Sequence, residues 1–321
     1  MTAALEPASL GDIRAAAARL RGAVVRTPLV RLGVEPAPAE IYLKLENLQP
    51  IGSFKLRGSG NALLSADPLL LREGVYTASA GNMAQGVAWW ARRLGVSATV
   101  VVPDHAPQTK LAAVERLGAR TLKVPFDRWW QTLVERSYPG IPGVFVHPVS
   151  DAAVVAGNGT IGLEILEDLP DVDAVLVPYG GGGLSCGIAS ALRALRPGTK
   201  VYACEVDTAA PLAASLQAGA PQAVAHTPSF VDGIGAKAVL AEMWPLAQRL
   251  LDGSLVVTLV EVASAIRTLL ERNRVLAEGA GAAPVAAALR GLGGSGKVVC
   301  VVSGGNIDVA KLGPILQGQL P

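Results

Sequence analysis

Short apolar runs alternate with longer segments of helical periodicity along most of the chain. The runs are rich in valine, isoleucine and tyrosine, which predicts strands over residues 41–45, 98–102, 121–124, 144–147, 174–178, 200–205 and 297–302. Apolar residues three and four positions apart predict helices over residues 82–94, 108–117, 156–166, 184–195, 261–272 and 280–289. This alternation is typical of a parallel sheet covered on both faces, and it predicts an α/β fold.

One apolar stretch, residues 174–192, is uncharged and long enough to raise the question of a membrane span. Pro178 and the glycines at 180–183 would leave backbone groups without hydrogen-bond partners in lipid. The stretch is better explained as a buried strand, a loop and a helix. We therefore expect no membrane partner.

Composition adds few constraints and excludes some partners. A length of 321 residues indicates roughly two domains. With 50% hydrophobic and 17% charged residues, the chain has ample material for a core. The formal net charge is +2 and the basic residues form no cluster, so nucleic acids and anionic membranes are not expected as partners.

The cysteines and the N-terminal residues bear on the cellular compartment. Cys186, Cys204 and Cys300 lie in apolar segments without CxxC spacing, which argues against a disulfide framework and against a zinc site. Glu6 and Asp12 interrupt any apolar segment of the kind found in a signal peptide. We expect a location in the reducing cytoplasm.

Three separated segments carry the candidate chemistry. Lys55 lies within Gly-Ser-Phe-Lys-Leu-Arg-Gly, four glycines occupy positions 180–183, and Ser303 begins Ser-Gly-Gly-Asn. Pyridoxal phosphate needs an amine for its aldehyde, backbone groups around its phosphate and a partner for its pyridine nitrogen. Each segment alone is weak evidence for such a site, because surface lysines, glycine-rich loops and capping serines are common. Their joint occurrence near strand and helix ends predicts a pyridoxal-phosphate pocket.

The glycine run discriminates among phosphate-containing ligands. It lies between the predicted strand at 174–178 and the predicted helix at 184–195, where backbone N–H groups and the helix dipole can bind an anion. A Walker A loop would require Gly-Lys-Ser/Thr, which is missing. A dinucleotide fingerprint would require glycine where Ser185 or Cys186 stands. ATP and NAD are therefore not expected.

Further motifs extend this pattern along the chain. Ser79-Ala80-Gly81-Asn82, Gly157-Asn158-Gly159-Thr160 and Glu278-Gly279-Ala280-Gly281 appear in order between the segments described above. Together the motifs resemble the serine/threonine dehydratase and serine racemase family, within the tryptophan-synthase-β-like group of pyridoxal enzymes (fold type II). The resemblance runs from about residue 10 to the C-terminus. It implies a large cofactor domain of residues 1–70 and 150–321, and a small mobile domain of residues 71–149 carrying the substrate-carboxylate loop.

The resemblance assigns a role to each matched position. It makes Lys55 the Schiff-base lysine, adjacent to Phe54 in the cofactor site, and makes Asn82 the partner of the cofactor's phenolic oxygen. It implies that Ser303 faces the pyridine nitrogen. The implied phosphate cradle is Gly180, Gly181, Gly182, Gly183 and Leu184. The implied substrate-binding loop is Ser79, Ala80, Gly81, Asn82 and Met83. Ser79 is also compatible with a simple helix N-cap.

The reaction implied by the resemblance is dehydration and deamination of a β-hydroxy amino acid such as threonine or serine. Lys55 removes the Cα proton, the β-hydroxyl leaves, and hydrolysis gives a 2-oxo acid and ammonia. Serine racemisation, β-replacement by a synthase of the same fold and non-catalytic ligand binding are the alternatives. Such synthases usually carry Thr-Ser-Gly-Asn where this chain has Ser79-Ala80-Gly81-Asn82. We also expect a homodimer.

Two positions of the substrate loop depart from the family pattern. Ala80 stands where racemases place a second hydroxyl, and its methyl group cannot donate a proton to the face opposite Lys55. Met83 stands where threonine dehydratases usually carry histidine. A methionine adapts to irregular apolar surfaces, so Met83 either lines a pocket for a bulkier, phenylserine-like substrate or simply packs in the core.

A third departure concerns divalent cations. The positions that correspond to the family's cation ligands are Glu205, Ala209 and Pro211. Proline in the last position removes an oxygen ligand, which weakens a calcium or magnesium site. We therefore expect no metal, and Asp207 is a poor substitute.

Overall fold

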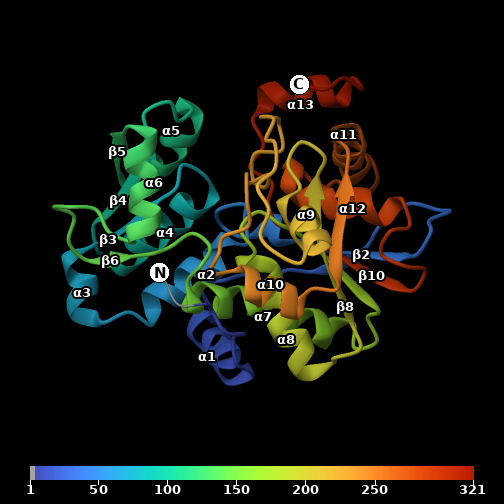
Figure 1. Cartoon of the computed structure of the whole chain (residues 1–321), viewed down its shortest axis with the longest axis horizontal. Helices are drawn as coiled ribbons and strands as arrows, with labels where there is room; N and C mark the ends of the chain where they lie inside the picture. The colour runs from blue at the N-terminus through green and yellow to red at the C-terminus, as the bar shows by residue number, and fades with distance from the viewer. Residues whose placement is uncertain (1–3) are drawn as a thin grey trace.

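Two sheets organise the chain. The computed structural model describes residues 4–321 and places the larger sheet at the right of Figure 1. Its strand order is β1-β2-β10-β7-β8-β9, with bounds Leu29–Arg31 for β1, Glu40–Lys44 for β2, Ala174–Pro178 for β7, Lys200–Val206 for β8, Gly253–Val257 for β9 and Lys297–Val301 for β10. Only β1 runs antiparallel to its neighbour in this described sheet, which confirms the parallel arrangement predicted from the sequence.

The smaller sheet is parallel throughout and lies at the left of Figure 1. Its strand order is β5-β4-β3-β6, with bounds Val75–Ala78 for β3, Ala98–Pro103 for β4, Arg120–Val124 for β5 and Val144–Phe145 for β6. All four strands lie in one continuous stretch of the sequence, between strands that belong to the larger sheet. The chain thus leaves the larger sheet after β2 and returns to it at β7.

Helices cover both sheets. Those before and around the smaller sheet are α1 (Leu10–Leu20), a 3₁₀ turn (Glu46–Leu48), α2 (Lys55–Leu64), α3 (Pro68–Glu73), α4 (Asn82–Leu94), α5 (Gln108–Arg116) and α6 (Phe126–Glu135). Those that follow are α7 (Ala152–Asp168), α8 (Gly183–Leu195), α9 (Pro211–Ala218), α10 (Trp244–Leu250), α11 (Leu259–Thr268), a π-helical turn (Leu269–Asn273), α12 (Gly279–Leu289) and α13 (Val309–Leu316).

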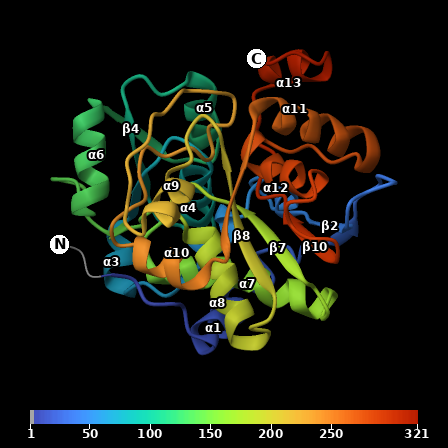
Figure 2. The same cartoon turned by 45° about the vertical axis from the view of Figure 1, so that its right-hand side comes forward.

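The central strands of the larger sheet are buried on both faces. Leu176 and Cys300 pack in the cluster that contains α11 and α12, whereas Val175 and Val299 pack against α7, α8 and α10. Figure 2 shows these two helix layers on opposite sides of β7, β8 and β10. Alternate residues of a strand point to opposite faces, so continuous apolar runs are required here.

The predicted strands and helices are all present, with shifted ends in several cases. The last turn of the helix expected over 261–272 is a π-helix, Leu269–Asn273. Residues 174–192 form β7, the glycine loop and the first turns of α8, as predicted. No helix within residues 4–321 is long and apolar enough to cross a membrane.

Several helices and strands were not predicted from the sequence, and of these α2 matters most for the site. Gly58 and Gly60 lie inside this helix, and glycine has a low helix propensity. The helix is buried along most of its length and packs between α4 and α7. Tertiary packing therefore forms a helix that local propensity does not favour.

Candidate active site

One cavity of about 430 Å³ collects every candidate site residue named from the sequence. Its walls include the segments that follow β3, β7 and β10 and the start of α2. The residues from these segments are Phe54, Lys55, Ser79, Ala80, Gly81, Asn82, Met83, Gly180, Gly181, Gly182, Gly183, Leu184 and Ser303. The strands β7 and β10 are parallel neighbours in the larger sheet, so their carboxyl ends share one edge, which explains how the glycine loop and Ser303 meet despite their separation in sequence.

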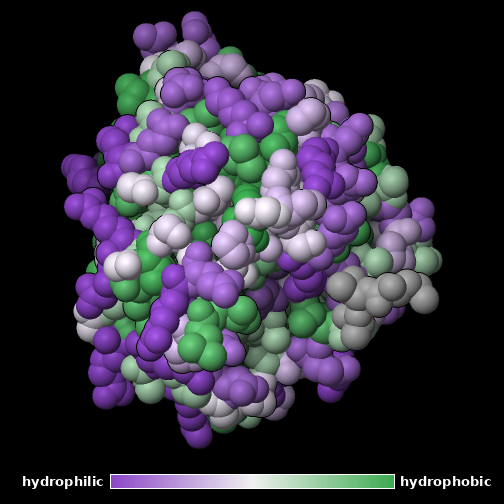
Figure 3. Space-filling view, turned by 90° about the vertical axis from the view of Figure 1, so that its left-hand side faces the viewer, coloured by the Kyte–Doolittle hydropathy of each residue, from purple (hydrophilic) through white to green (hydrophobic). Residues whose placement is uncertain are grey.

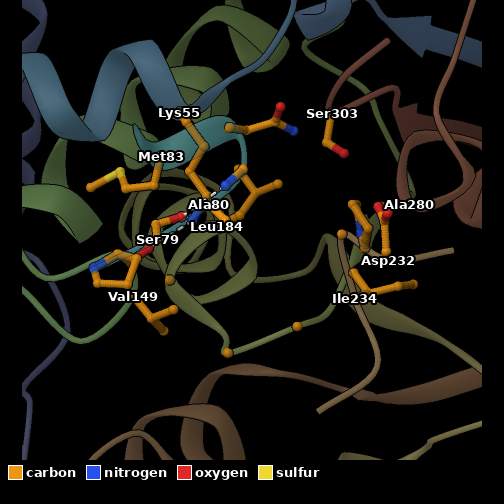
Figure 4. A pocket seen from close by; sticks show the side chains of 18 of the residues that line it. Lys55, Ser79, Ala80, Met83, Val149, Leu184, Asp232, Ile234, Ala280 and Ser303 are labelled. Atoms are coloured by element: carbon orange, nitrogen blue, oxygen red, sulfur yellow. Dashed lines mark hydrogen bonds between the residues drawn. The ribbon is translucent and has the colours of Figure 1, made fainter. Parts of the chain in front are cut away.

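Lys55 is the first residue of α2 and extends into the cavity (Figure 4). Its Nζ donates a hydrogen bond to the carbonyl oxygen of Pro148 over 2.7 Å. Burial lowers the pKa of Lys55 to about 8, although the negative charge of Glu278 opposes this shift. A lysine with this pKa has a substantial neutral fraction near physiological pH, as a nucleophile or base requires.

The glycine loop, residues 180–183, connects β7 to α8. Gly182 has φ of +95°, a conformation that favours glycine. A Cβ on Gly181 would lie 2.5 Å from Val149 Cγ1, and a Cβ on Gly183 would lie 2.8 Å from the Val149 carbonyl oxygen. Gly181 and Gly183 therefore have no room for side chains, and the N-terminus of α8 faces the cavity with favourable polarity for an anion.

Asn82 and Glu278 form a polar link across the cavity. Asn82 Nδ2 donates to Glu278 Oε1 over 2.9 Å, and Asn306 Nδ2 donates to Asn82 Oδ1 over 2.8 Å. Burial raises the pKa of Glu278 to about 7, although the hydrogen bond from Asn82 partly offsets this. Glu278 belongs to a motif recognised in the sequence, but no role was predicted for it. Its position directly before the glycine-rich start of α12 was the available signal.

The substrate loop, residues 79–83, leads into α4. Ser79 is not the helix cap: Gly81 occupies that position, and Ser79 Oγ accepts a hydrogen bond from the Gly81 N–H at 3.3 Å. Met83 is 1% exposed and packs in the core beneath the smaller sheet. Figure 4 shows its side chain pointing away from Ser303 and Asp232. The structure thus favours core packing as the main role of the Met83 side chain.

Ser303 follows β10 and lies across the cavity from Lys55 (Figure 4). The residue is 2% exposed, and its carbonyl oxygen accepts a hydrogen bond from the Phe54 N–H over 2.9 Å. This bond joins the end of β10 to the residue before Lys55. Phe54 places its ring 5.1 Å from Lys55 Nζ.

The sequence analysis missed an aromatic part of the cavity wall. Phe126 and Trp129 of α6 line the cavity, with their ring centroids 5.5 Å apart. The Trp129 Nε1 atom is buried and has no hydrogen-bond partner in the described structure. A pattern of aromatic residues on a predicted amphipathic helix would have been the signal, but no helix was predicted over residues 126–135.

Glu205 is occupied by interactions within the protein. Its carboxylate accepts hydrogen bonds from the backbone N–H groups of Leu212 and Ala213, at 2.9 and 2.8 Å, and from Ser254 Oγ at 2.6 Å. It therefore caps the start of α9. Within residues 4–321, no group of three or more His, Cys, Asp or Glu side chains is arranged to hold a metal ion.

A buried ion network fixes the start of α2. Arg57 donates to both oxygens of Glu46 over 2.8 Å and to the two oxygens of Glu164 over 2.7 and 2.9 Å. Lys44 Nζ lies 2.6 Å from Glu164. Arg57 and Glu46 are 2% and 0% exposed. Because Arg57 is two residues after Lys55, the network holds the backbone from which Lys55 extends.

These features fit pyridoxal phosphate. The cavity combines a loop that excludes Cβ atoms, a lysine amine of depressed pKa and a serine hydroxyl on the opposite wall. A family model described as pyridoxal-phosphate dependent enzyme matches residues 20–304. The chain belongs to this family, as the sequence predicted, and its cofactor is pyridoxal phosphate.

The chain is similar to particular enzymes in sequence and in structure. The chain is 42% identical to the L-threonine ammonia-lyase of Thermotoga maritima over 317 residues, covering 97% of this chain and 79% of the relative. The processed form of threonine deaminase isoform 2 from Solanum lycopersicum superimposes with a TM-score of 0.88 at 31% identity, covering 98% and 91% of the two chains. Maize serine racemase gives a TM-score of 0.87 at 31% identity, covering 96% of each chain. These likenesses confirm the predicted fold.

Proposed function

We propose that this protein deaminates a β-hydroxy L-amino acid such as L-threonine or L-serine to a 2-oxo acid and ammonia. The observation that carries the proposal is the meeting of Lys55, the glycine loop and Ser303 in one cavity. Relatives named threonine ammonia-lyase and threonine deaminase support this substrate class. Ammonia release from L-threonine, L-serine and L-threo-phenylserine, measured with pyridoxal phosphate present, tests the proposal directly.

The proposal gives the cofactor-binding residues defined positions around the cofactor. The glycine loop and Leu184 would hold the phosphate, Asn82 would bind the phenolic oxygen, Ser303 would serve the pyridine nitrogen, and Phe54 would belong to the same cofactor site. When bound, pyridoxal phosphate supplies an aldehyde for amines and an electron-accepting ring. The hydroxyl of Ser303 carries no charge, so it does not hold the ring nitrogen protonated, which favours elimination over transamination.

In the proposed reaction Lys55 is the base that removes the Cα proton of the substrate. Its Nζ, neutral in part because burial lowers its pKa to about 8, takes the proton from the substrate Cα. The substrate carboxylate binds the backbone N–H groups of the Ser79–Met83 loop, where the start of α4 favours negative charge. With the carboxylate and the amine both fixed, the Cα proton is directed toward Lys55. Transfer of this proton from Lys55 to the β-hydroxyl lets the hydroxyl leave as water and returns Lys55 to its neutral form, and the released enamine hydrolyses to the 2-oxo acid and ammonia.

We also propose that residues 71–149 form a small domain that moves toward the rest of the chain during turnover. The smaller sheet and α4, which carries the substrate loop, lie within this range. Lys110 of α5 pairs with Asp232 of the other unit over 2.9 Å beside the cavity. Closure would exclude water from the reacting atoms.

We also propose that the protein is a homodimer located in the cytoplasm. The side of the molecule at the left of Figure 1 carries exposed apolar residues on α3 and α6, namely Leu69, Leu70, Phe126, Trp130 and Val134. Figure 3 shows hydrophobic patches separated by polar side chains on that side. The three cysteines are unpaired and buried, which suits a reducing compartment. Sedimentation velocity would distinguish a dimer from the 32.9 kDa monomer.

Ala80 leads to a prediction about the stereochemical outcome. Because its methyl group cannot deliver a proton to the face opposite Lys55, L-serine should give pyruvate with little D-serine. Chiral chromatography of the products measures the ratio. The Ala80→Ser variant should raise the D-serine fraction if a hydroxyl reaches that face. D-serine formed by the wild type as fast as pyruvate would contradict the prediction.

The aromatic wall favours a second candidate function, in which a bulkier β-hydroxy amino acid is the preferred substrate. Phe126 and Trp129 line the cavity, and apolar surfaces gain about 25 cal/mol per Å² buried, so an aryl substituent packed there could gain a few kcal/mol. We expect wild-type kcat/KM for L-threo-phenylserine to lie within about tenfold of that for L-threonine. Trp129→Ala should lower the phenylserine value selectively.

The variant Met83→His tests the other position that was considered for determining substrate size. Since the Met83 side chain packs in the core, this substitution should leave the phenylserine-to-threonine ratio of kcat/KM almost unchanged. A ratio that shifts toward threonine in Met83→His and stays constant in Trp129→Ala would assign substrate size to Met83. If the wild type strongly prefers threonine and neither substitution changes that preference, the protein has ordinary threonine/serine dehydratase activity and the bulkier substrate is excluded.

A further inference from the structure

A turn between β6 and α7, residues 147–150, is held together by a histidine ring. His147 is 5% exposed. Its Nδ1 accepts hydrogen bonds from the backbone N–H groups of Val149 and Ser150, over 3.1 and 2.8 Å. A nitrogen that accepts two such bonds carries no proton, which places the proton of the neutral ring on Nε2. Burial, together with the charges of Arg136 and Lys55, lowers the pKa of His147 to about 3, so the ring is neutral under physiological conditions.

The two residues in the middle of this turn both touch the cavity. The Pro148 carbonyl oxygen accepts the hydrogen bond from Lys55 Nζ at 2.7 Å. Val149 packs against the glycine loop so closely that a Cβ on Gly181 or Gly183 would come within 2.5 or 2.8 Å of it. Figure 4 shows Val149 on the same side of the cavity as Lys55. One short turn therefore contacts both the amine and the loop.

The far end of the turn is also held by other residues, although Ser150 Oγ lies 3.1 Å from His147 Nδ1 as well. Arg136 Nη2 donates to the Ser150 carbonyl oxygen over 2.6 Å and contacts Ser150 Oγ at 2.9 Å. Ser150 Oγ donates to Glu242 Oε1 over 2.9 Å. Asp151 then caps α7 through the N–H groups of Ala153 and Val154. These bonds fix Ser150 and the start of α7, but they leave the Val149 and Ser150 N–H groups to His147.

We propose that His147 is a positioning residue, which sets the Pro148 carbonyl against Lys55 and Val149 against the glycine loop. The inference rests on the proposed function, because it takes Lys55 as the reacting amine and the loop as the phosphate site. Without an acceptor at Nδ1, two largely buried N–H groups lose their partner, and the turn must rearrange to find another. A shift of Pro148 and Val149 changes both contacts at once, because the surrounding packing is dense.

A positioning role differs from simple stabilisation in what it predicts. Loss of core stability alone would lower the melting temperature and leave the folded site intact. Loss of the turn geometry would weaken cofactor binding and slow turnover in the molecules that remain folded. The substrate carboxylate binds a different loop, so KM for L-threonine should change little.

The experiment compares three variants of the holoenzyme with the wild type. His147→Phe keeps a planar ring and removes the acceptor, whereas His147→Asn keeps an acceptor near the position of Nδ1. Thr77→Val is the matched control: buried Thr77 Oγ1 donates to the Val146 carbonyl, directly before His147, over 2.8 Å, and does not line the cavity. Melting temperature, the Kd of pyridoxal phosphate by equilibrium dialysis, and kcat and KM for L-threonine are measured for each.

We expect His147→Phe to raise the Kd of pyridoxal phosphate about tenfold and to lower kcat about tenfold, with KM nearly unchanged. His147→Asn should restore most of both losses. Thr77→Val should lower the melting temperature and leave Kd and kcat within about twofold of the wild type. If His147→Phe does not fold, His147→Leu takes its place, and the Asn variant is still compared with Thr77→Val.

Two results would overturn the inference: a Phe or Leu variant with the Kd and kcat of Thr77→Val, or an Asn variant that folds and binds pyridoxal phosphate no better than the acceptor-free variant. Failure of the proposed function is recognised separately. In that case the wild type and Thr77→Val would themselves release no ammonia from L-threonine, or borohydride reduction would fail to attach the cofactor to Lys55.

Discussion

The Lys55→Ala variant should lose ammonia release from L-threonine by a factor of about 10⁴ or more. Alanine removes both the amine that reacts with the cofactor aldehyde and the base that takes the Cα proton. The other lysine lining the cavity, Lys110, pairs with Asp232 over 2.9 Å and has no comparable freedom. The glycine loop is unchanged by the substitution, so pyridoxal phosphate should still bind through its phosphate.

Three measurements test this expectation. Wild-type holoenzyme should be yellow, and borohydride reduction followed by peptide mapping should place the label on Lys55. Lys55→Ala should take up no label but should retain pyridoxal phosphate in equilibrium dialysis. Lys110→Ala, the control for the labelling, should keep the label at Lys55. Label on another lysine in the wild type, or turnover of Lys55→Ala within about tenfold of the wild type, would contradict the assignment.

Much of the fold and of the cavity could be predicted because the signals are local. The strand β7 is a continuous apolar run, β10 is apolar after Lys297, and each ends within two residues of a segment that lines the cavity. A glycine run after such a strand indicates a tight approach to an anion whether or not the rest of the fold is known. Parallel strands present their carboxyl ends together, so local motifs were enough to predict that Gly180 and Ser303 meet.

The features that sequence analysis missed depend on contacts between distant segments. The acceptor of the Lys55 hydrogen bond is the Pro148 carbonyl, 93 positions away, and the partner of Asn82 is Glu278, 196 positions away. Backbone carbonyls have no sequence signature, and a glutamate before a helix is more often a cap. Met83 is a different case, because its place in the loop allowed either a substrate contact or core packing, and its side chain packs in the core while also lining the cavity.

The helix that carries Lys55 was missed for a related reason. Its sequence, Lys-Leu-Arg-Gly-Ser-Gly-Asn-Ala-Leu-Leu, combines glycines with polar residues that are buried in the structure, such as Arg57 and Asn61. Buried polar residues break the apolar periodicity on which a helix prediction depends. Their hydrogen-bond partners, which make burial tolerable, lie elsewhere in the chain. The stability of this helix therefore depends on the ion network around Arg57.

Replacing Arg57 by methionine should lower the free energy of unfolding by about 3–5 kcal/mol, because it leaves a buried carboxylate without its partner. Glu46 is fully buried. Burial alone would raise the pKa of Glu46, but the charge and hydrogen bonds of Arg57 outweigh burial and hold this pKa below its ordinary value. In the variant, burial prevails and the pKa of Glu46 rises. Glu164 is less affected, because Lys44 remains 2.6 Å from it.

The sign of the pH dependence follows from that reversal. In the wild type the depressed pKa of Glu46 contributes stability that is present above the unfolded pKa and is lost as pH falls through the folded pKa. In Arg57→Met the pKa of Glu46 is higher in the folded state than in the unfolded state. Its contribution to stability is therefore present below the unfolded pKa and is lost as pH rises through the folded pKa. The destabilisation relative to the wild type should therefore be larger at neutral pH than under mildly acidic conditions.

Urea denaturation of the holoenzyme at several pH values, with Glu46→Gln and Arg57→Met/Glu46→Gln as companions, tests the argument. Glutamine keeps the volume of Glu46 and an oxygen to accept the bond from Thr27, which spans 2.6 Å in the wild type. The double variant no longer buries an unpaired charge, so it should be more stable than Arg57→Met alone, with a coupling energy of about 1–3 kcal/mol. Additive losses in the two single variants, with no dependence on pH, would show that Arg57 acts through packing and not through the charge of Glu46.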